Sequence, residues 1–287
     1  MDLTKRLILI TGGSSGIGKA VARHCLAAGA SVIICSRDAN SLERARAELE
    51  PGATGTQQII TRSLDVSRPA EVERVLDSLQ DQLGSLSGLV NAAGVLGPKG
   101  SLDEVDMTEW VTTIQVNLIG TVLMCRGVLP YFREQRYGKI INFSGGGATS
   151  PRPRFSAYAA SKTAVVRFTE NLAEELKDTG IFVNAIAPGA VNTRMLEEVL
   201  AAGPEKVGQR AYEEALKQTQ LGGTSPDRAG ALCAMLLSSE GDGITGRLIS
   251  AVWDAWELLP ERKDALSRSD VYTLRRIVPV DRGLKWE

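Results

Sequence analysis

The sequence predicts an α/β fold in which a doubly wound, mainly seven-stranded parallel sheet carries helices on both faces and ends in a C-terminal extension. Short apolar runs alternate with longer segments of helical periodicity, as expected of repeated βαβ units. The runs are apolar throughout rather than alternating, which is typical of strands covered by helices on both faces. A glycine-rich turn joins the first apolar run to the first helical segment.

Seven segments are predicted as strands because each is a short apolar run that ends at turn residues or at a helical pattern. They are Leu7–Ile10, Ser31–Cys35, Ile59–Leu64, Leu86–Asn91, Lys139–Phe143, Phe182–Ala187 and Leu248–Val252. Between the strands, apolar residues recur at helical spacing. The predicted helices are Ile17–Ala28, Ala39–Leu49, Ala70–Leu83, Thr108–Arg133 and Ser156–Lys177.

The 287 residues show no linker, repeat or break in composition, so we expect one domain over residues 1–254 and an extension over residues 255–287. The polar segment Met195–Ser225 is expected to embellish the domain. The extension contains Trp256, Tyr272 and Trp286, which a disordered tail would lack. We therefore expect it to pack on its own domain or on a neighbouring subunit. Its arginines are expected to reach the substrate cleft of the same chain or of a neighbouring subunit, and they are Arg275, Arg276 and Arg282.

Composition excludes several classes of protein. The 33 Lys and Arg balance 34 Asp and Glu, which argues against a nucleic-acid binder. No run approaches the roughly 18 consecutive apolar residues of a membrane span, and the N-terminal apolar segment is too short for a signal peptide. The four cysteines lack CxxC spacing, which indicates buried thiols in a reducing cytoplasm. No metal site is expected, because His24 is the single histidine.

The segment TGGSSGIG, residues 11–18, has the properties of a dinucleotide-binding turn. Gly12 permits a tight turn, Gly16 lets the backbone approach a pyrophosphate, and Gly18 allows the helix to pack closely on the strand. The helix that follows presents free N–H groups and a partial positive charge to phosphates. The position of the turn, after a strand and before a helix, favours this function over a simple surface turn.

Further motifs follow along the chain. They are Asn91-Ala92-Ala93-Gly94 after the fourth strand, Tyr158-Ala159-Ala160-Ser161-Lys162 at the start of a helix, and Pro188-Gly189 with Thr193 after the sixth strand. Together with the glycine turn they resemble the short-chain dehydrogenase/reductase family over about residues 5–250. The resemblance implies a Rossmann fold that binds NAD(P). It implies cofactor contacts from Gly12, Ser14, Ser15, Gly16, Ile17, Gly18, Ser36, Arg37, Asp65, Val66, Asn91, Ala92, Gly94, Tyr158, Lys162, Pro188, Gly189, Val191 and Thr193.

Tyr158 and Lys162 are four residues apart, so on a helix they share one face. A neighbouring lysine charge disfavours the neutral phenol, whose ordinary pKa is about 10. By resemblance, Tyr158 is the acid/base, and Lys162 binds the ribose and lowers the tyrosine pKa. Asn117 belongs by resemblance to a proton relay through water. An alternative for Asn117 is a polar residue that caps or kinks a long helix.

One departure from the family pattern concerns the substrate-orienting serine, thirteen residues before the tyrosine, where this chain has Gly145. Ser144 is adjacent and could supply a hydroxyl if the glycine-rich loop shifts its register. Otherwise Tyr158 and a backbone N–H would hold the carbonyl oxygen, as in an oxyanion hole. The three consecutive glycines could also leave room for a bulky substrate.

The end of the second strand favours NADP over NAD. NAD-specific folds place an acidic residue there to bind the ribose 2′-hydroxyl. Here Ser36 is followed by Arg37, whose guanidinium suits a 2′-phosphate. Asp38 is one position further along, where we expect it to begin a helix. The basic residue that some NADP-binding members carry inside the glycine turn is replaced by Ser15.

The leading function is an NADP(H)-dependent oxidoreductase that transfers hydride between nicotinamide and a secondary alcohol or ketone. Arg152 and Arg154 suit an acidic or sugar-like small molecule, although solvated loop arginines are equally expected. The apolar helices Thr108–Arg133 and Ser156–Lys177 predict a homodimer or homotetramer. The alternatives are an epimerase or dehydratase that uses the cofactor transiently, and a non-catalytic NADPH-binding scaffold, which Tyr158-dependent turnover would exclude.

Overall fold

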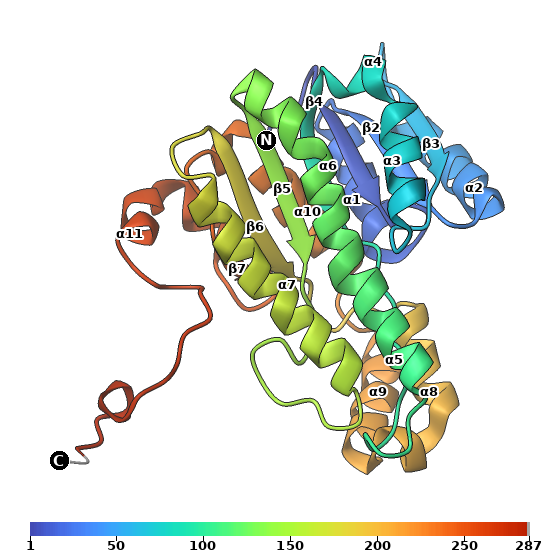
Figure 1. The fold of residues 1–287 in the computed structure, drawn as a ribbon, viewed down its shortest axis with the longest axis vertical. Coiled ribbons are helices and arrows are strands. Elements are labelled where there is room, and N and C mark those ends of the chain that lie inside the picture. The colour runs from blue at the N-terminus through green and yellow to red at the C-terminus, as the bar shows by residue number, and fades with distance from the viewer. Residues whose placement is uncertain (286–287) are drawn as a thin grey trace.

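The computed structural model describes residues 1–285, which form a seven-stranded parallel sheet in the order β3-β2-β1-β4-β5-β6-β7 (Figure 1). This arrangement confirms the predicted fold class. The strand order reverses between β1 and β4, and ligands bind such sheets at the carboxyl ends of the strands near this reversal. The strands are β1 (Leu7–Thr11), β2 (Ser31–Ser36), β3 (Ile59–Ser63), β4 (Leu86–Asn91), β5 (Gly138–Phe143), β6 (Ile181–Ala187) and β7 (Leu248–Ser250).

Eleven α-helices connect and cover the strands within the described residues. They are α1 (Gly16–Ala27), α2 (Ala39–Leu49), α3 (Pro69–Asp77), α4 (Gln80–Leu83), α5 (Met107–Ile114), α6 (Gly120–Gln135), α7 (Ser156–Glu175), α8 (Arg194–Val207), α9 (Gln209–Leu221), α10 (Pro226–Leu237) and α11 (Lys263–Ser267). A π turn, Gln115–Ile119, joins α5 to α6. Short 3₁₀ segments occur at Glu50–Gly52, Ser239–Gly241, Trp256–Glu261 and Pro279–Arg282.

Each face of the sheet has its own apolar core, because successive side chains of a strand point to opposite faces. Ile8 and Ile10 of β1 belong to the core beneath α1, α2 and α10. Leu7 and Leu9 of the same strand belong to the opposite core, beneath α3, α6 and α7. Figure 1 shows α6 and α7 covering the face toward the viewer, with α8 and α9 beyond the carboxyl ends of the strands. Double coverage explains why the strands are apolar throughout.

Two predicted helices are interrupted. The segment predicted as one helix over Thr108–Arg133 contains the π turn, a local insertion of one residue that an apolar pattern does not reveal. The segment predicted over Ala70–Leu83 is divided between α3 and α4. There the Ser78 hydroxyl donates to the carbonyl of Val75 at 2.7 Å, a local bond that competes with helix continuation.

The last strand, predicted to reach Val252, ends at Ser250. Its end is set by a turn in which the Ser250 N–H donates to the carboxylate of Asp254 at 2.6 Å. The Ser250 hydroxyl accepts the N–H groups of Val252 and Trp253 at 3.3 and 3.1 Å. These backbone groups are therefore unavailable for a longer strand.

The run Met107–Gln135 is long and apolar enough to cross a membrane when judged by length and composition alone. Its apolar side chains, however, pack inside the protein. Met124, Cys125, Val128 and Phe132 are fully buried against the sheet, in the same core as α3 and α7. The run is therefore a core helix of the α/β fold.

All four cysteines are buried free thiols, as predicted, and they are Cys25, Cys35, Cys125 and Cys233. Burial raises the pKa of the Cys25, Cys35 and Cys125 thiols to about 12. A thiol with such a pKa is neutral and unreactive near neutral pH. The cysteines thus behave as small apolar core residues.

The first part of the C-terminal extension lies on the domain. Trp256, Leu259 and Leu266 are buried in the core beneath α10. The Leu248 N–H of β7 donates to the carbonyl of Tyr272 at 2.8 Å, so the extension runs along the outer edge of the last strand. The Arg247 side chain holds it there through bonds to several main-chain carbonyls, which include those of Ser269 and Val271 at 2.9 and 2.7 Å.

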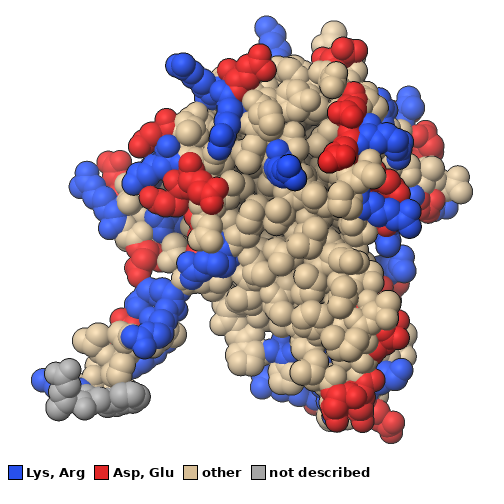
Figure 2. Space-filling model, in the orientation of Figure 1, with Lys and Arg blue, Asp and Glu red and all other residues tan. Residues whose placement is uncertain are grey.

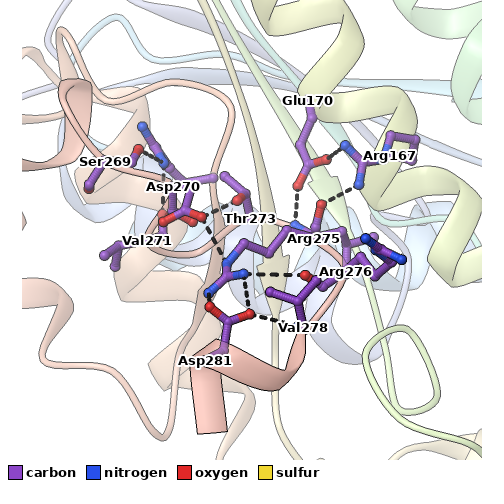
Figure 3. A network of polar contacts seen from close by, with 12 residues as sticks. Arg167, Glu170, Ser269, Asp270, Val271, Thr273, Arg275, Arg276, Val278 and Asp281 are labelled. Carbon is purple, nitrogen blue, oxygen red and sulfur yellow. Dashed lines mark hydrogen bonds and ion pairs between the residues drawn. The ribbon is translucent and has the colours of Figure 1, made fainter. Parts of the chain in front are cut away.

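The rest of the extension is held by its own polar contacts and leads away from the domain (Figures 1 and 3). Arg275 pairs with Asp270 at 2.8 Å and with Asp281 at 2.7 Å, and Glu170 of α7 accepts the Leu274 N–H at 2.6 Å. The expectation that Arg275, Arg276 and Arg282 reach the cleft of the same chain is therefore wrong, because these contacts direct the segment elsewhere. Trp286 lies outside the described residues.

Candidate functional site

The glycine turn between β1 and α1 has room only for glycines. A Cβ on Gly12, which has φ +68°, would lie 2.8 Å from the Ala93 nitrogen. A Cβ on Gly18 would lie 2.2 Å from the Gly12 carbonyl oxygen. Gly16 has φ +52° and no such conflict, so its requirement is the left-handed backbone. The three glycines therefore fix a tight turn that lies against the end of β4.

The turn presents the start of α1 to the carboxyl edge of the sheet. Ser15 is the N-cap of this helix and makes no side-chain capping bond, so the first N–H groups have no side-chain acceptor there. Such groups, together with the helix dipole, bind phosphates. Ile17, one residue into the helix, lines the large cavity described below. This cradle fits the pyrophosphate of a dinucleotide.

The residues expected to contact the adenosine lie just after the ends of β2 and β3. Arg37 is exposed just after β2, and Ser36 accepts the Asp38 N–H at 3.3 Å. Asp38 caps α2 by accepting the Asn40 N–H at 3.0 Å, which confirms that it begins this helix. Burial tends to raise the pKa of Asp65, but bonds from Ser67 and the charge of Arg37 lower it overall. Arg37 and Asp65 therefore face the same region.

The end of β4 contributes both structural and site residues. The Asn91 side chain turns into the interior and donates to the side-chain amide oxygen of Asn142 at 2.9 Å. Its own amide oxygen is buried without a partner among the described residues. Ala92 lies beside Gly12, and Gly94 lies where a Cβ would be 3.5 Å from the Lys162 ammonium. The loop after β4 therefore connects the glycine turn to the helix that carries Lys162.

Tyr158 and Lys162 both lie on the buried face of α7, near its start. The Lys162 ammonium donates to the Phe143 carbonyl at 2.9 Å and lies 5.8 Å from the centroid of the Tyr158 ring. Burial lowers the pKa of Lys162 to about 8. Burial also raises the pKa of Tyr158, and the charge of Arg152 counteracts this rise. The phenol is therefore protonated near neutral pH and available as an acid.

Asn117 lies in the π turn between α5 and α6 and is fully buried. Its amide accepts the Val95 N–H at 2.8 Å and donates to the Val95 carbonyl at 2.9 Å. It also donates to the Ser161 hydroxyl at 3.0 Å, which in turn donates to the Tyr158 carbonyl at 2.7 Å. Asn117 thus lies at an irregularity of a long helix, as the alternative expectation had it, and its bonds connect this irregularity to the helix that carries Tyr158. π turns of this kind are frequent at functional sites.

Gly145 lies against Tyr158. A Cβ on Gly145 would be 2.3 Å from the tyrosine hydroxyl oxygen. Ser144 is 3% exposed, and its hydroxyl has no hydrogen-bond partner among the described residues. The residues that line the cavity include Gly145, Gly146 and Gly147 but not Ser144. The Tyr158 hydroxyl thus occupies the space that a serine side chain at position 145 would need.

A cavity of about 950 Å³ opens in front of Tyr158. It lies between the carboxyl ends of β5, β6 and β7 on one side and α8 and α9 on the other, with one wall from the loop before α7. Thr193, the N-cap of α8, lies at the cavity between the glycine turn and this helix. The remaining predicted residues of this wall, Pro188, Gly189 and Val191, also line the cavity. The cavity therefore adjoins both the glycine turn and Tyr158.

The two loop arginines have different environments. Arg154 has φ +66° and donates to the carbonyl of Glu205 at 2.7 Å, so it ties its loop to α8. The half-buried Arg152 lies over the Phe155 ring at 4.3 Å and over the Tyr158 ring at 5.5 Å. Within residues 1–285 its guanidinium has no hydrogen-bond or ion-pair partner. Arg152 is therefore the arginine that is free to bind a substrate.

Several residues of the cavity were not among the site residues predicted from the sequence. Trp253 is 85% exposed at the cavity, just after β7. Glu214 and Gln218 reach the cavity from α9, and Arg210 holds Glu214 at 2.9 Å. For α9, the sequence indicates only a polar segment of helical pattern. Its placement over the cavity follows from the path of α8, which no local pattern specifies.

Comparisons with known proteins identify the family of this chain. The family model described as short chain dehydrogenase matches residues 6–203. A 2-(S)-hydroxypropyl-CoM dehydrogenase of Xanthobacter autotrophicus is 33% identical over 85% of this chain and 94% of its own length. The crystal structure of a levodione reductase has a TM-score of 0.78 and 31% identity, and it covers 86% of this chain and 96% of its own. The structure of an actinorhodin polyketide ketoreductase variant with NADPH has a TM-score of 0.77 and 29% identity, over 87% and 97% of the two chains.

The chain therefore belongs to the short-chain dehydrogenase/reductase family. It is an oxidoreductase that acts on CH–OH or C=O groups of small molecules. Members of the family bind NAD or NADP, and membership does not decide between the two.

Proposed function

We propose that this protein transfers hydride between NADP(H) and a secondary alcohol or ketone that is acidic or sugar-like. The observation that carries the proposal is the placement of Tyr158 beside the unpaired Arg152 at the wall of the cavity. The glycine turn, which fits a pyrophosphate, adjoins the same cavity. A cofactor bound at the turn therefore has access to a substrate bound against the tyrosine.

In the proposed reaction, bound NADPH supplies the hydride that reduces the carbonyl carbon. Tyr158 holds the carbonyl oxygen by a hydrogen bond and gives it the phenol proton. Lys162 binds the ribose and keeps a positive charge near the tyrosine. Asn117, through its bonds to Val95 and Ser161, keeps the tyrosine helix in place and supports the proton relay.

An acidic or sugar-like substrate is favoured by the polarity of the cavity wall. Three arginines and two carboxylates line it, and they are Arg152, Arg154, Arg210, Glu214 and Asp254. Amide and hydroxyl groups that suit sugar hydroxyls also line it, and they include Thr149, Ser150, Gln209, Gln218 and Ser250. Positive charge therefore exceeds negative charge where the substrate would bind, and it includes the unpaired guanidinium.

NADP is favoured by the surroundings of Arg37. Asp38 is engaged as the cap of α2, which leaves Arg37 as the charged group at the end of β2 that is free to meet a 2′-phosphate. Arg37→Ala is expected to weaken NADP(H) binding at least about tenfold more than NAD(H) binding, since it removes a charge-assisted contact that only the phosphate makes. Isothermal titration of both cofactors measures this, and equal losses would refute the preference. Asp38→Asn is the control, because asparagine keeps the cap.

Assembly into a homodimer or homotetramer is favoured by the surface over α6 and α7, which is largely uncharged in Figure 2. At one end of this region Met107, Val111 and Ile119 are exposed apolar residues. Light scattering at micromolar concentration tests the assembly, and a monomer would refute it. We place the enzyme in the cytoplasm, because four free thiols suit a reducing compartment.

The reaction is tested by following NADPH and NADH oxidation with three probes: acetoacetate, its neutral ethyl ester, and the ketose fructose. We expect reduction that depends on Tyr158, so that Tyr158→Phe abolishes turnover while cofactor affinity and the fold are kept. Preference for acetoacetate or fructose over the ester would support the substrate class. Residual activity of Tyr158→Phe close to that of the wild type would show that another group transfers the proton.

A further inference from the structure

Two features near the proposed catalytic tyrosine remain unexplained: a glycine where a hydroxyl donor is expected, and an arginine without a partner. The reacting oxygen must lie close to the Tyr158 hydroxyl to receive its proton. A single donor rarely suffices at such a position, because negative charge develops on the oxygen in the transition state. The question is which other group of this chain can donate there.

The two loop positions that could carry the substrate-orienting serine do not provide this donor. Residue 145 is glycine, and the Tyr158 hydroxyl already occupies the space beside its α-carbon. Ser144 is buried and does not line the cavity. Neither position 144 nor position 145 therefore places a hydroxyl at the cavity next to the tyrosine.

Arg152 is placed there. Its guanidinium faces the Tyr158 ring at 5.5 Å and approaches Gly146, whose Cβ would lie 3.4 Å from Nη1. Gly146 directly follows Gly145, so the tyrosine hydroxyl and the guanidinium border on adjacent residues of one loop. Because these glycines have no side chains, the Tyr158 hydroxyl and the Arg152 guanidinium both remain open to the cavity.

The arginine is positioned without being neutralised. Its guanidinium carbon lies 4.3 Å from the centroid of the buried Phe155 ring, a cation–π contact that helps to position the side chain. The nearest carboxylate that influences it, Glu214, is already paired with Arg210 at 2.9 Å. Arg152 thus keeps its five N–H donors available on a side chain that packing has oriented.

We propose that Arg152 is a catalytic residue, whose guanidinium donates a hydrogen bond to the reacting oxygen of the substrate beside Tyr158. This inference rests on the function proposed above. In the reduction, the C=O π bond breaks, the carbon gains the hydride from NADPH, and the oxygen gains the proton of the Tyr158 hydroxyl. Arg152 keeps its proton throughout and stabilises the charge on the oxygen. Its charge also favours the phenolate that Tyr158 becomes.

The test compares Arg152→Gln with the wild type on ethyl acetoacetate, which is neutral, and on acetoacetate, which is acidic. A donor to the reacting oxygen serves both ketones, so kcat should fall about 100-fold for both, the loss typical of an oxyanion donor. Arg152→Lys should recover part of this loss, and guanidinium ion should restore turnover to Arg152→Ala. Arg74→Gln, an exposed arginine on α3, is the control and should match the wild type.

The outcomes separate this inference from the proposed function. If Arg152→Gln lowers only the affinity for acetoacetate and leaves kcat on the ester within about threefold, Arg152 is a carboxylate binder and the inference is overturned. If the wild type reduces none of the three probes with either cofactor, the proposed function fails, and the inference fails with it. Should Arg152→Gln not fold, the other two variants decide. Failure of guanidinium ion to rescue Arg152→Ala would overturn the inference. Full activity of Arg152→Lys would overturn it as well.

Discussion

The ammonium of Lys162 donates a hydrogen bond to the main-chain carbonyl of Phe143 at 2.9 Å, and so connects α7 to the end of β5. Phe143 immediately precedes the loop that contains Gly145. The lysine therefore holds together the helix that presents Tyr158 and the loop that lies against it. It does so as a buried cation, and burial lowers its pKa toward neutral pH.

The first prediction concerns pH. Burial lowers the pKa of Lys162 from its ordinary value to about 8, so Lys162 is charged below that pH and neutral above it. We expect kcat/KM for ketone reduction to be steady up to about pH 8 and to fall above it, because the charge near Tyr158 is lost. Lys162→Arg should move this fall to higher pH, since arginine stays protonated. A fall at the same pH in Lys162→Arg would show that another group titrates.

The second prediction concerns Asn117. Asn117→Ala removes three buried hydrogen bonds, those to the Val95 N–H, the Val95 carbonyl and the Ser161 hydroxyl. Each buried group left without a partner costs about 1 to 3 kcal/mol, so we expect a loss of at least ~2 kcal/mol in the free energy of unfolding. Urea denaturation measures this. The exposed Asn192 provides the control, and Asn192→Ala should change stability by less than about 0.5 kcal/mol.

The third prediction concerns Gly145. Gly145→Ser restores the residue type that the family pattern has, yet we expect kcat to fall by at least about tenfold, since a misplaced reacting group costs much of the rate. The physical reason is that the new Cβ would lie 2.3 Å from the Tyr158 hydroxyl and would displace it. Gly84→Ala is the comparison, because a Cβ at Gly84 would meet nothing within 4 Å. A serine variant more active than the wild type would contradict this account.

The fourth prediction concerns the C-terminal extension. Truncation after Trp253 removes Trp256, Leu259 and Leu266 from a core, and we expect insoluble or strongly destabilised protein. Truncation after Leu274 keeps these residues and the cover of β7, and we expect kcat and KM close to those of the full chain. Steady-state kinetics and thermal unfolding of both variants check this. A raised KM in the variant truncated after Leu274 would show that residues beyond 274 enter the cleft of a partner subunit.

The sequence predicted the parts of this protein that local chemistry determines. All seven strands, the glycine turn and the cap at Asp38 follow from apolar runs and from turn and capping residues. The interruption of α5 and α6 could not be predicted, because an extra residue in a π turn leaves the apolar pattern almost unchanged. The extension was predicted to cover apolar surface. Which surface it covers depends on long-range contacts, such as those of Arg247 and Glu170, that no local pattern contains.

The same limit applies to the site. The spacing of Tyr158 and Lys162 placed them on one helix face, and the structure has both on the buried face of α7. The sequence could not distinguish Arg152 from Arg154, two residues apart in one loop. The left-handed backbone of Arg154 turns it toward α8, whereas Arg152 turns onto Phe155 and Tyr158. The difference between a structural and a functional arginine is here a matter of loop geometry.

The bond between the Leu248 N–H and the Tyr272 carbonyl has a consequence for how the protein is made. The chain emerges from the ribosome with its N-terminus first, and β7 is followed by the segment that covers it. Until Tyr272 has emerged, the outer edge of β7 presents unpaired backbone groups that can capture a strand from another nascent chain. The outer edge of the sheet is thus covered only after both β7 and the segment up to Tyr272 have been synthesised. A premature stop between Trp253 and Tyr272 would leave all seven strands present but the outer edge of β7 uncovered, and the product would be prone to aggregate.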